Sequence, residues 1–207
     1  MTQVRPEIAR IASVSALLFL LLYSGVLLYF GADRETLLGS AAKSGALLTL
    51  IVGFWAFYNK WGWRLRPLRL GGWLSAVPDL NGRWEGTVCR HRDDSPHPFV
   101  MEITQTFSKL SFRTFSATSR GESIVAALFV DDTGPVFSVV AVWRTTTRRH
   151  EDRTVEDTFD GASLWRVSFV GDTKRIEDQY FTRREPATKG VADLTWISST
   201  LTNRFES

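Results

Sequence analysis

Two long apolar segments near the N-terminus constrain what this chain can fold into more than any other feature. They run over residues 11–30 and 37–58, and only residues 31–36 separate them. A helix needs about 20 apolar residues to cross a hydrocarbon core of roughly 30 Å, and each segment reaches that length. The sequence therefore predicts a two-helix transmembrane hairpin, so the rest of the chain is expected to work at a membrane surface.

Basic residues flank this hairpin and predict its orientation. Arg5 and Arg10 precede the first segment, further Lys and Arg follow the second, and the intervening loop holds only Arg34. Because cytoplasmic flanks are enriched in Lys and Arg, we expect a multi-pass protein with both termini in the cytoplasm. A cleaved signal peptide is the competing interpretation, but the first segment exceeds the usual signal length and no small-x-small cleavage site follows it.

Small residues crowd the start of the second apolar segment. Ala41 and Gly45 are four apart on one helix face, which allows helix backbones to approach closely, either within the hairpin or between protomers. Lys43 either reaches the lipid headgroups or lines a polar seam between protomers. These three residues are the candidates for oligomerisation. Aromatic and basic residues then alternate up to residue 71, which is typical of a segment that contacts lipid headgroups.

The remaining residues, 72–207, are enough for one further domain. Before Gly72 there are 8 basic and 3 acidic residues, which leaves 17 basic and 19 acidic residues in the second part. This near-neutral balance excludes a long nucleic acid as a partner. Cys89 is the single cysteine and no Asn-x-Ser/Thr glycosylation site occurs, which agrees with a reducing compartment.

From Asn81 onward the apolar period becomes two, which predicts β-strands. Turn signals separate them and no helical segment intervenes, so we expect a mainly β domain: a small antiparallel eight-stranded β-barrel. Such a barrel has room for side chains or one small ligand. The charged residues 145–157 are interpreted as a mobile solvated loop or a hairpin extension. The predicted strands are residues 82–90, 99–107, 110–118, 123–130, 136–144, 163–170, 175–183 and 190–198.

Strand alternation selects candidate residues for the lumen of this barrel. Arg144 shares a face with Val140 and Val142, which places its guanidinium at one mouth, although the opposite face with Trp143 is also apolar and the assignment is open to inversion. Guanidinium groups bind phosphate and aromatic rings stack on bases, so the set favours a flat anionic ligand. Each Trp has a second interpretation as barrel core. The candidate ligand-binding residues are Arg144, Tyr180, Thr182, Trp84, Thr114, Ser116 and Trp196.

Metal and catalytic motifs give no comparable pattern. Cys89, His91 and His97 form a C-x-H-x5-H cluster whose spacing fits no tight pair of zinc ligands. Neither a nucleophile elbow, a Gly-rich phosphate loop nor an HExxH motif occurs in the sequence. We therefore expect a binding protein rather than an enzyme, with no cofactor and no metal.

The whole chain resembles one family. The features that carry this are the two N-terminal spans, the basic aromatic linker, "LNGRWEG" at Leu80–Gly86 and "YFTRREPATKGVADLTW" at Tyr180–Trp196. They resemble the two-transmembrane β-barrel effectors associated with CD-NTases in CBASS antiphage systems, the CD-NTase-associated protein 15 family. The resemblance implies a bacterial inner-membrane protein that binds a cyclic dinucleotide from a CD-NTase, oligomerises and disrupts the membrane, so that the infected cell dies.

Two other classes of protein fit the same strand pattern. Gly82-x-Trp84 at the start of the first barrel strand is similar to calycin barrels, which suggests a membrane-tethered carrier of an apolar ligand. Such a carrier would lack an inward cluster of Arg, Tyr and Thr. A non-enzymatic scaffold module would instead have a packed lumen without a cavity. The contents of the lumen therefore distinguish the three hypotheses.

Overall fold

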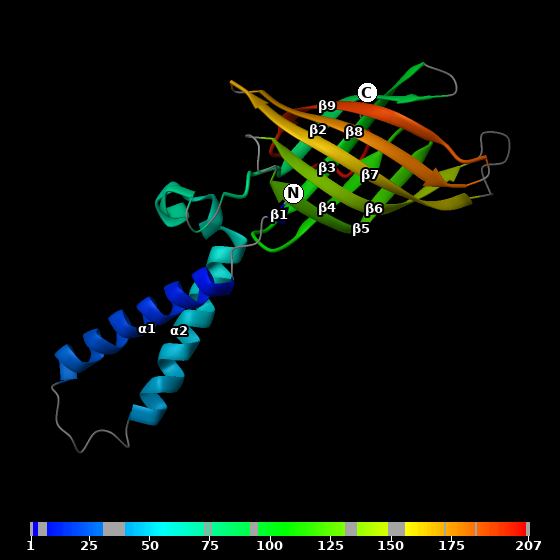
Figure 1. Cartoon of the computed structure of the whole chain (residues 1–207). Coiled ribbons are helices and arrows are strands. Elements are labelled where there is room, and N and C mark those ends of the chain that lie inside the picture. The colour runs from blue at the N-terminus through cyan, green and yellow to red at the C-terminus, as the bar shows by residue number, and fades with distance from the viewer. Residues whose placement is uncertain are drawn as a thin grey trace. The chain divides into compact units, whose positions relative to one another are not determined.

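The computed structural model describes residues 2–3, 8–30, 40–72, 74, 76–91, 95–130, 136–148, 156–171, 173–184 and 186–205. The chain divides into two compact units, and the boundary falls between Val77 and Pro78. Arg5–Val77 form a helical unit, and Pro78–Ser207 form a β unit that also includes the N-terminal Met1–Val4 (Figure 1). The predicted boundary, at residues 71 and 72, lies close to this division.

Two α-helices and two short 3-10 helices make up the helical unit. α1 spans Ile8–Phe30, α2 spans Ser40–Lys60, η2 spans Gly62–Arg64 and η3 spans Arg66–Gly72. The two α-helices cover most of the predicted apolar segments, while residues 37–39 of the second segment lie outside the described residues. In the described part of the chain, neither helix has the length and apolar character of a membrane span, so the transmembrane hairpin is not confirmed.

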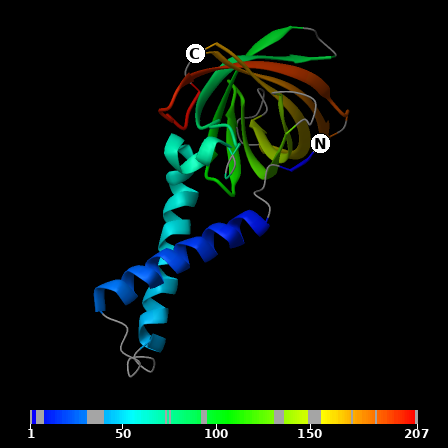
Figure 2. The same cartoon turned by 60° about the vertical axis from the view of Figure 1, so that its left-hand side comes forward.

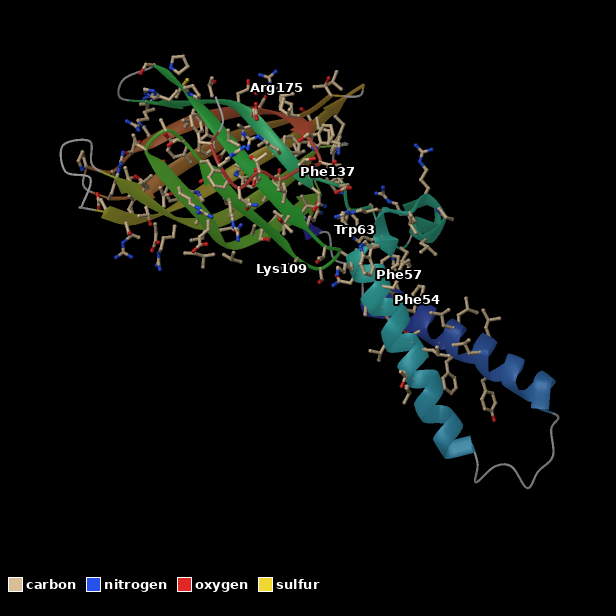
Figure 3. The ribbon with its side chains drawn as sticks, turned by 180° about the vertical axis from the view of Figure 1, so that it is seen from behind. Phe54, Phe57, Trp63, Lys109, Phe137 and Arg175 are labelled. Carbon is tan, nitrogen blue, oxygen red and sulfur yellow. The ribbon has the colours of Figure 1, made fainter. Side chains whose placement is uncertain are left out.

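The two α-helices contact each other through polar and aromatic side chains. The indole Nε1 of Trp55 on α2 donates to Oγ of Ser15 on α1 over 2.9 Å. Figure 3 labels Phe54 and Phe57 on the same helix as Trp55. Large apolar side chains also remain more than half exposed on both helices: Leu17, Leu20, Leu21, Leu48, Leu50 and Val52.

The candidate oligomerisation residues lie in the first turns of α2. A Cβ atom added at Gly45 would meet no other group within 4 Å. The side chains of Ala41 and Lys43 lie outside the described residues. Their role in association stays a prediction.

The β unit is a closed antiparallel barrel of eight strands, as the alternation pattern predicts. Each strand from β2 to β9 pairs with its neighbours in sequence, and pairing between β2 and β9 closes the ring (Figure 2). A short strand β1, Thr2–Gln3, adds to β5 at Phe129 and Val130, which the sequence pattern did not predict. The barrel strands are β2 Gly82–Arg90, β3 Pro96–Gln105, β4 Leu110–Phe115, β5 Ser119–Val130, β6 Phe137–Arg148, β7 Glu156–Val170, β8 Thr173–Arg183 and β9 Lys189–Ser198.

The described residues of the charged segment 145–157 belong to two paired strands, so they extend the hairpin of β6 and β7. Strand β6 continues to Arg148 and β7 begins at Glu156, so Thr145, Thr146 and Thr147 pair with residues 157–159. The interpretation as a mobile loop is wrong for these residues, because β-branched threonines favour a paired strand even among charges. Residues 149–155 lie outside the described residues.

One end of the barrel is filled by large apolar side chains, and we call it the closed end. Trp84 is fully buried there, and its Nε1 donates to the backbone oxygen of Leu80 over 3.0 Å. The rings of Phe112 and Trp165 meet edge to face with centroids 4.7 Å apart. The buried side chains at this end pack against one another as a core. Its main side chains are Leu80, Trp84, Ile103, Trp165, Ile176 and Leu194.

A buried ion pair fastens the C-terminal tail to the outside of the barrel. Arg83 on β2 and Glu102 on β3 are only 4% and 3% exposed, and Nη1 of Arg83 lies 3.1 Å from Oε1 of Glu102. The backbone N–H groups of Thr202 and Asn203 donate to the same carboxylate over 2.7 and 3.1 Å. The carboxylate of Glu102 therefore has two roles: it compensates the buried charge of Arg83, and it binds the backbone of the C-terminal tail.

Candidate functional site

A cavity of about 500 Å³ opens at the end of the barrel opposite the closed end, and we call it the mouth cavity. All eight barrel strands or the turns beside them contribute to its lining, including Val88 on β2, Ser119 on β5 and Ala192 on β9. The contributing parts are the C-terminal ends of β2, β4, β6 and β8 and the N-terminal ends of their partners. The eight-stranded ring therefore encloses a real lumen at this end.

Three aromatic side chains form one wall of the mouth cavity. Trp143 on β6 lies with its ring centroid 6.3 Å from that of Phe159 on β7 and 6.5 Å from that of Tyr180 on β8. Glycines make room for these rings: a Cβ at Gly161 would lie 2.4 Å from the Trp143 ring, and one at Gly190 would lie 2.6 Å from the Tyr180 hydroxyl. The wall thus depends on two positions that carry no side chain.

Hydroxyl groups and cations surround this aromatic wall. Arg90 and Arg184 both line the cavity, together with His97. The guanidinium of Arg184 lies 4.8 Å from the Phe159 ring centroid, and its Nε donates to Oγ1 of Thr188 over 2.9 Å. Arginines beside hydroxyls suit an anionic ligand. The lining hydroxyl residues are Thr114, Ser116, Thr118, Ser119, Thr145, Thr147, Ser163, Tyr180, Thr182 and Thr188.

A single acidic side chain, Asp178, is found among the described residues that line the cavity. It is 6% exposed and accepts a hydrogen bond at Oδ2 from Oγ of Ser163 over 3.1 Å. Nε1 of Trp143 donates to the same Ser163 hydroxyl over 2.9 Å. Burial raises the pKa of Asp178 to about 7, and the hydrogen bond from Ser163 opposes that rise.

Four of the seven candidate ligand-binding residues line the mouth cavity. Thr114 and Ser116 come from β4 and the turn after it, while Tyr180 and Thr182 come from β8 and the predicted face of that strand. The structure therefore brings these four together from two strands that are far apart in the sequence. Their contact with a ligand stays a prediction.

Arg144 is not in the lumen, so its predicted orientation is wrong. Its side chain is 55% exposed and its Nε donates to Oδ1 of Asp160 over 2.8 Å on the outer face. The pair raises the pKa of Arg144 and lowers that of Asp160. The inward face of β6 is the opposite one, where Val139 is fully buried and Trp143 lines the mouth cavity.

The two candidate tryptophans are placed away from the cavity as well. Trp84 belongs to the closed end, where its ring is packed on all sides. Trp196 donates its Nε1 to the backbone oxygen of Asn81 over 2.9 Å, and Nζ of Lys174 lies 5.1 Å from its ring centroid. Neither residue lines the mouth cavity. The alternative interpretation of both as structural residues fits the geometry.

Sequence reasoning missed five residues that give the cavity its character. Trp143 lies on the face of β6 that the sequence left as the alternative, and Asp178 lies in a run of charged residues on β8 that resembles a solvated strand. Inward parity with Tyr180 was the available signal for Asp178, since residues two apart share a face. Arg184 directly follows β8, and no alternation rule places it. The missed lining residues are Arg90, Trp143, Phe159, Asp178 and Arg184.

The candidate metal cluster remains dispersed in the structure. Cys89 lies within β2, and Nε2 of His97 is 3.2 Å from Oγ of Ser95. Across the described ranges, no three His, Cys, Asp or Glu side chains gather as metal ligands would.

Comparison with protein families matches residues 75–196 to the family described as "Cap15, cyclic dinucleotide receptor domain". The match covers more than half of the chain and includes the whole ring of strands apart from the last residues of β9. The curated proteins contain no match to this chain. A barrel with a polar and aromatic lumen, together with this family match, shows that the chain belongs to the Cap15 family of CBASS effectors with a cyclic dinucleotide receptor domain.

Proposed function

We propose that the mouth cavity binds a cyclic dinucleotide and that the chain is a membrane effector of antiphage defence. The observation that carries this proposal is the composition of the cavity: an aromatic wall, a set of hydroxyls and two arginines around about 500 Å³. Small-molecule sites have volumes of about 300–1,000 Å³, so the size suits one ligand. The family match supports the class of ligand.

Each part of a cyclic dinucleotide has a matching group in the cavity. Bases stack on aromatic rings at about 1–3 kcal/mol per base, which Trp143, Phe159 and Tyr180 offer. Arg90 and Arg184 carry charge suited to the two phosphates, and the threonine hydroxyls suit sugar and phosphate oxygens. Binding, rather than a covalent reaction, is the activity that we propose for this site.

The residues that line the lumen also distinguish a cyclic dinucleotide receptor from the two alternatives, a carrier of apolar ligands and a scaffold module. A carrier of apolar ligands needs a lumen without clustered Arg, Tyr and Thr, whereas these residues line the mouth cavity. A scaffold module needs a packed lumen, whereas this barrel is packed only at its closed end. Both observations favour a receptor for a polar ligand.

The second part of the proposal concerns the helices. We infer that α1 and α2 form a hairpin in the bacterial inner membrane with both termini in the cytoplasm. Exposed leucines on both helices and basic residues on both flanks support this assignment. If the ligand binds the associated state better than the resting state, its differential affinity drives assembly through α2, and assembly disrupts the membrane. The ligand would come from a CD-NTase.

Titration of the full chain in detergent micelles with cyclic dinucleotides tests the binding step. We expect saturable binding by the wild type and about 10- to 100-fold weaker binding by Tyr180→Ala, because the variant loses one stacking ring of the cavity. Calorimetry measures both affinities.

Arg144→Ala is the matched control for this titration. It also truncates a large strand residue, but one that lies on the outer face, so its affinity should equal that of the wild type. Equal affinities of wild type and Tyr180→Ala, or a loss restricted to Arg144→Ala, would contradict the assignment of the mouth cavity.

The assembly step predicts that ligand increases particle mass. Light scattering of the full chain in micelles should show larger oligomers at saturating ligand, and Gly45→Leu should reduce them, because Gly45 leaves open space for a second helix. Leu50→Phe adds bulk at an exposed position about 140° away around α2 and is the control. An unchanged mass at saturating ligand would remove this step from the proposal.

A further inference from the structure

The C-terminal tail, residues 199–205, contributes one residue to the mouth cavity. Phe205 lines the cavity although it lies outside all the barrel strands. It is half-buried, so it is neither packed in a core nor fully exposed to solvent. An aromatic ring in such a place offers a surface on which a base can stack. The tail is therefore part of the cavity, although strand alternation cannot place it.

Hydrogen bonds hold the tail against the outer face of the barrel (Figure 2). The backbone N–H groups of Thr202 and Asn203 both donate to the carboxylate of Glu102 on β3. Nη1 of Arg113 on β4 donates to Oδ1 of Asn203 over 2.7 Å. Glu102 and Arg113 lie directly opposite each other in the register of β3 and β4, so the tail crosses the two strands at this pair.

Two features of the tail direct the residues that follow this crossing. Asn203 has a left-handed backbone conformation, with a φ of 57°, which changes the direction of the chain. Nη1 of Arg83 on β2 donates to the backbone oxygen of Arg204 over 3.0 Å. Phe205 follows directly, so its position depends on the contacts that residues 202–204 make with β2, β3 and β4.

The pairing between β3 and β4 ends one outward pair beyond this crossing. Val100 and Phe115 are the last pair toward the mouth, and they share the outer face with Glu102 and Arg113. They are nevertheless only 3% and 4% exposed, so other groups cover them. Successive outward residues of a strand are about 7 Å apart, a distance that two residues of extended chain span, so Phe205 reaches this last pair.

Beyond the last pair, the mouth cavity opens between the two strands. Residues 96–99 of β3 pair with β2 alone in the part of the chain that the structure describes. Pro98 shares the outer face of β3 with Val100, yet it lines the cavity, as does Ala117 in the turn after β4. The cavity lining therefore reaches the outer face here, at what we call the side gap. The tail lies over the same two strands, so Phe205 closes the side gap.

The side gap lies across the barrel from the aromatic wall. Three strands separate β3 from β7, and three separate β4 from β8, in either direction around the ring. Phe159 is on β7 and Tyr180 is on β8. A ligand between the wall and the side gap therefore meets aromatic rings on two opposite sides.

We propose that Phe205 stacks on the second base of a cyclic dinucleotide whose first base stacks on the aromatic wall. This inference rests on the proposed function of the mouth cavity. A ring of two sugars and two phosphates separates the two bases of such a ligand, so the wall alone leaves one base without a stacking partner. Phe205 supplies the second surface. Arg83, Glu102 and Arg113 are positioning residues, because they act on the ligand only through the tail.

Calorimetric titration of the full chain in micelles with cyclic di-GMP, cyclic di-AMP and cyclic di-UMP tests the inference. For each probe that the wild type binds, Phe205→Ala should bind at least about tenfold more weakly, because one base loses its stacking surface. Phe205→Trp should retain the wild-type affinity. Phe205→Leu fills the side gap without an aromatic face, so its affinity should stay at least about fivefold weaker than that of the wild type.

Leu201→Ala is the matched control for these variants. It truncates an apolar side chain of the same tail that is 37% exposed and does not line the cavity. Its affinity should equal that of the wild type. A loss in Leu201→Ala as large as in Phe205→Ala would contradict a specific role of the Phe205 ring.

A double-variant cycle separates positioning of the ring from a general loss of stability. Glu102→Ala releases the tail and should weaken binding about as much as Phe205→Ala does. In the Phe205→Ala background the same change should weaken binding no further, because no ring is left to position. A second loss of equal size in that background would overturn the positioning role of Glu102.

The outcomes distinguish this inference from the proposed function. If the wild type binds none of the three probes, the proposed function fails and the inference with it. If the wild type binds but Phe205→Ala retains its affinity, or if Phe205→Leu restores it fully, only the role of Phe205 is overturned. Circular dichroism verifies that each variant is folded. If Phe205→Ala does not fold, the comparison of Phe205→Trp with Phe205→Leu decides, because both side chains fill the side gap.

Discussion

Replacing Glu102 with alanine is expected to lower the free energy of unfolding by about 1–3 kcal/mol. The change leaves Arg83, which is 4% exposed, with the partly exposed Glu85 as its acidic partner, and it removes the acceptor for the N–H groups of Thr202 and Asn203. Urea unfolding of the full chain in micelles, followed by tryptophan fluorescence, measures the loss. Release of the C-terminal tail should accompany it as faster proteolysis after residue 198.

Two further variants define the cause of this loss. Arg144→Ala removes an ion pair that is exposed on the outer face, and its unfolding midpoint should match that of the wild type. The double variant Arg83→Met, Glu102→Leu should recover most of the stability, because apolar partners leave no buried charge uncompensated. A loss in Glu102→Ala no larger than in Arg144→Ala would show that the buried pair has no special role.

The largest effect on binding is expected from Gly161→Leu. A Cβ at Gly161 would lie 2.4 Å from the Trp143 ring, so the leucine must push the indole into the cavity or out of the aromatic wall. Either movement breaks the hydrogen bond from Trp143 to Ser163 and removes a stacking surface. We expect an affinity for cyclic dinucleotides at least about 100-fold weaker than that of the wild type.

The neighbouring residue provides a control for this variant. Ala162→Leu adds the same side chain to the same strand, but on the outer face, and should bind as the wild type does. Circular dichroism verifies that both variants remain folded. Full affinity in a folded Gly161→Leu variant would place the ligand elsewhere.

Strand positions were predictable because they depend on local chemistry. Period-two alternation and turn residues such as Gly171 determine where strands run, and β2 begins and ends at the predicted residues, Gly82 and Arg90. The eight-stranded closure also follows, since consecutive antiparallel strands leave two edges that pair with each other. Strand β1 was not predictable, because two polar residues carry no alternation pattern.

The inward face of β6 could not be determined from its sequence. Val140 and Val142 alternate with Val139 and Trp143, so both faces are apolar in the sequence. In the structure Val140 and Val142 are exposed, whereas Val139 is fully buried. Which set enters the lumen depends on how the bulky indole packs over Gly161 of the adjacent strand. That contact is tertiary, and the error at Arg144 follows from it.

Strand alternation in the sequence also does not predict site residues that lie in turns or beyond the end of a strand. Arg184 follows β8 and reaches the cavity through its contacts with Phe159 and Thr188. By contrast, Tyr180 and Thr182 were predictable because they continue the regular alternation of β8, where the outward residue Arg175 is solvent-exposed (Figure 3). The polar half of the site was therefore partly visible in the sequence. Arg90 also continues the alternation of Trp84 and Val88 on β2, whereas Arg184 lies beyond the predicted strand.

The central claim is that a cyclic dinucleotide occupies the mouth cavity, and photo-crosslinking tests it most directly. The full chain in micelles is irradiated with an azido-labelled cyclic dinucleotide, and labelled peptides are identified by mass spectrometry with unlabelled ligand as competitor. The account predicts competed labelling of peptides that contain Trp143, Phe159 or Tyr180, and its loss in Gly161→Leu. Competed labelling confined to α1, α2 or the outer face of the barrel, or none at all, would contradict it.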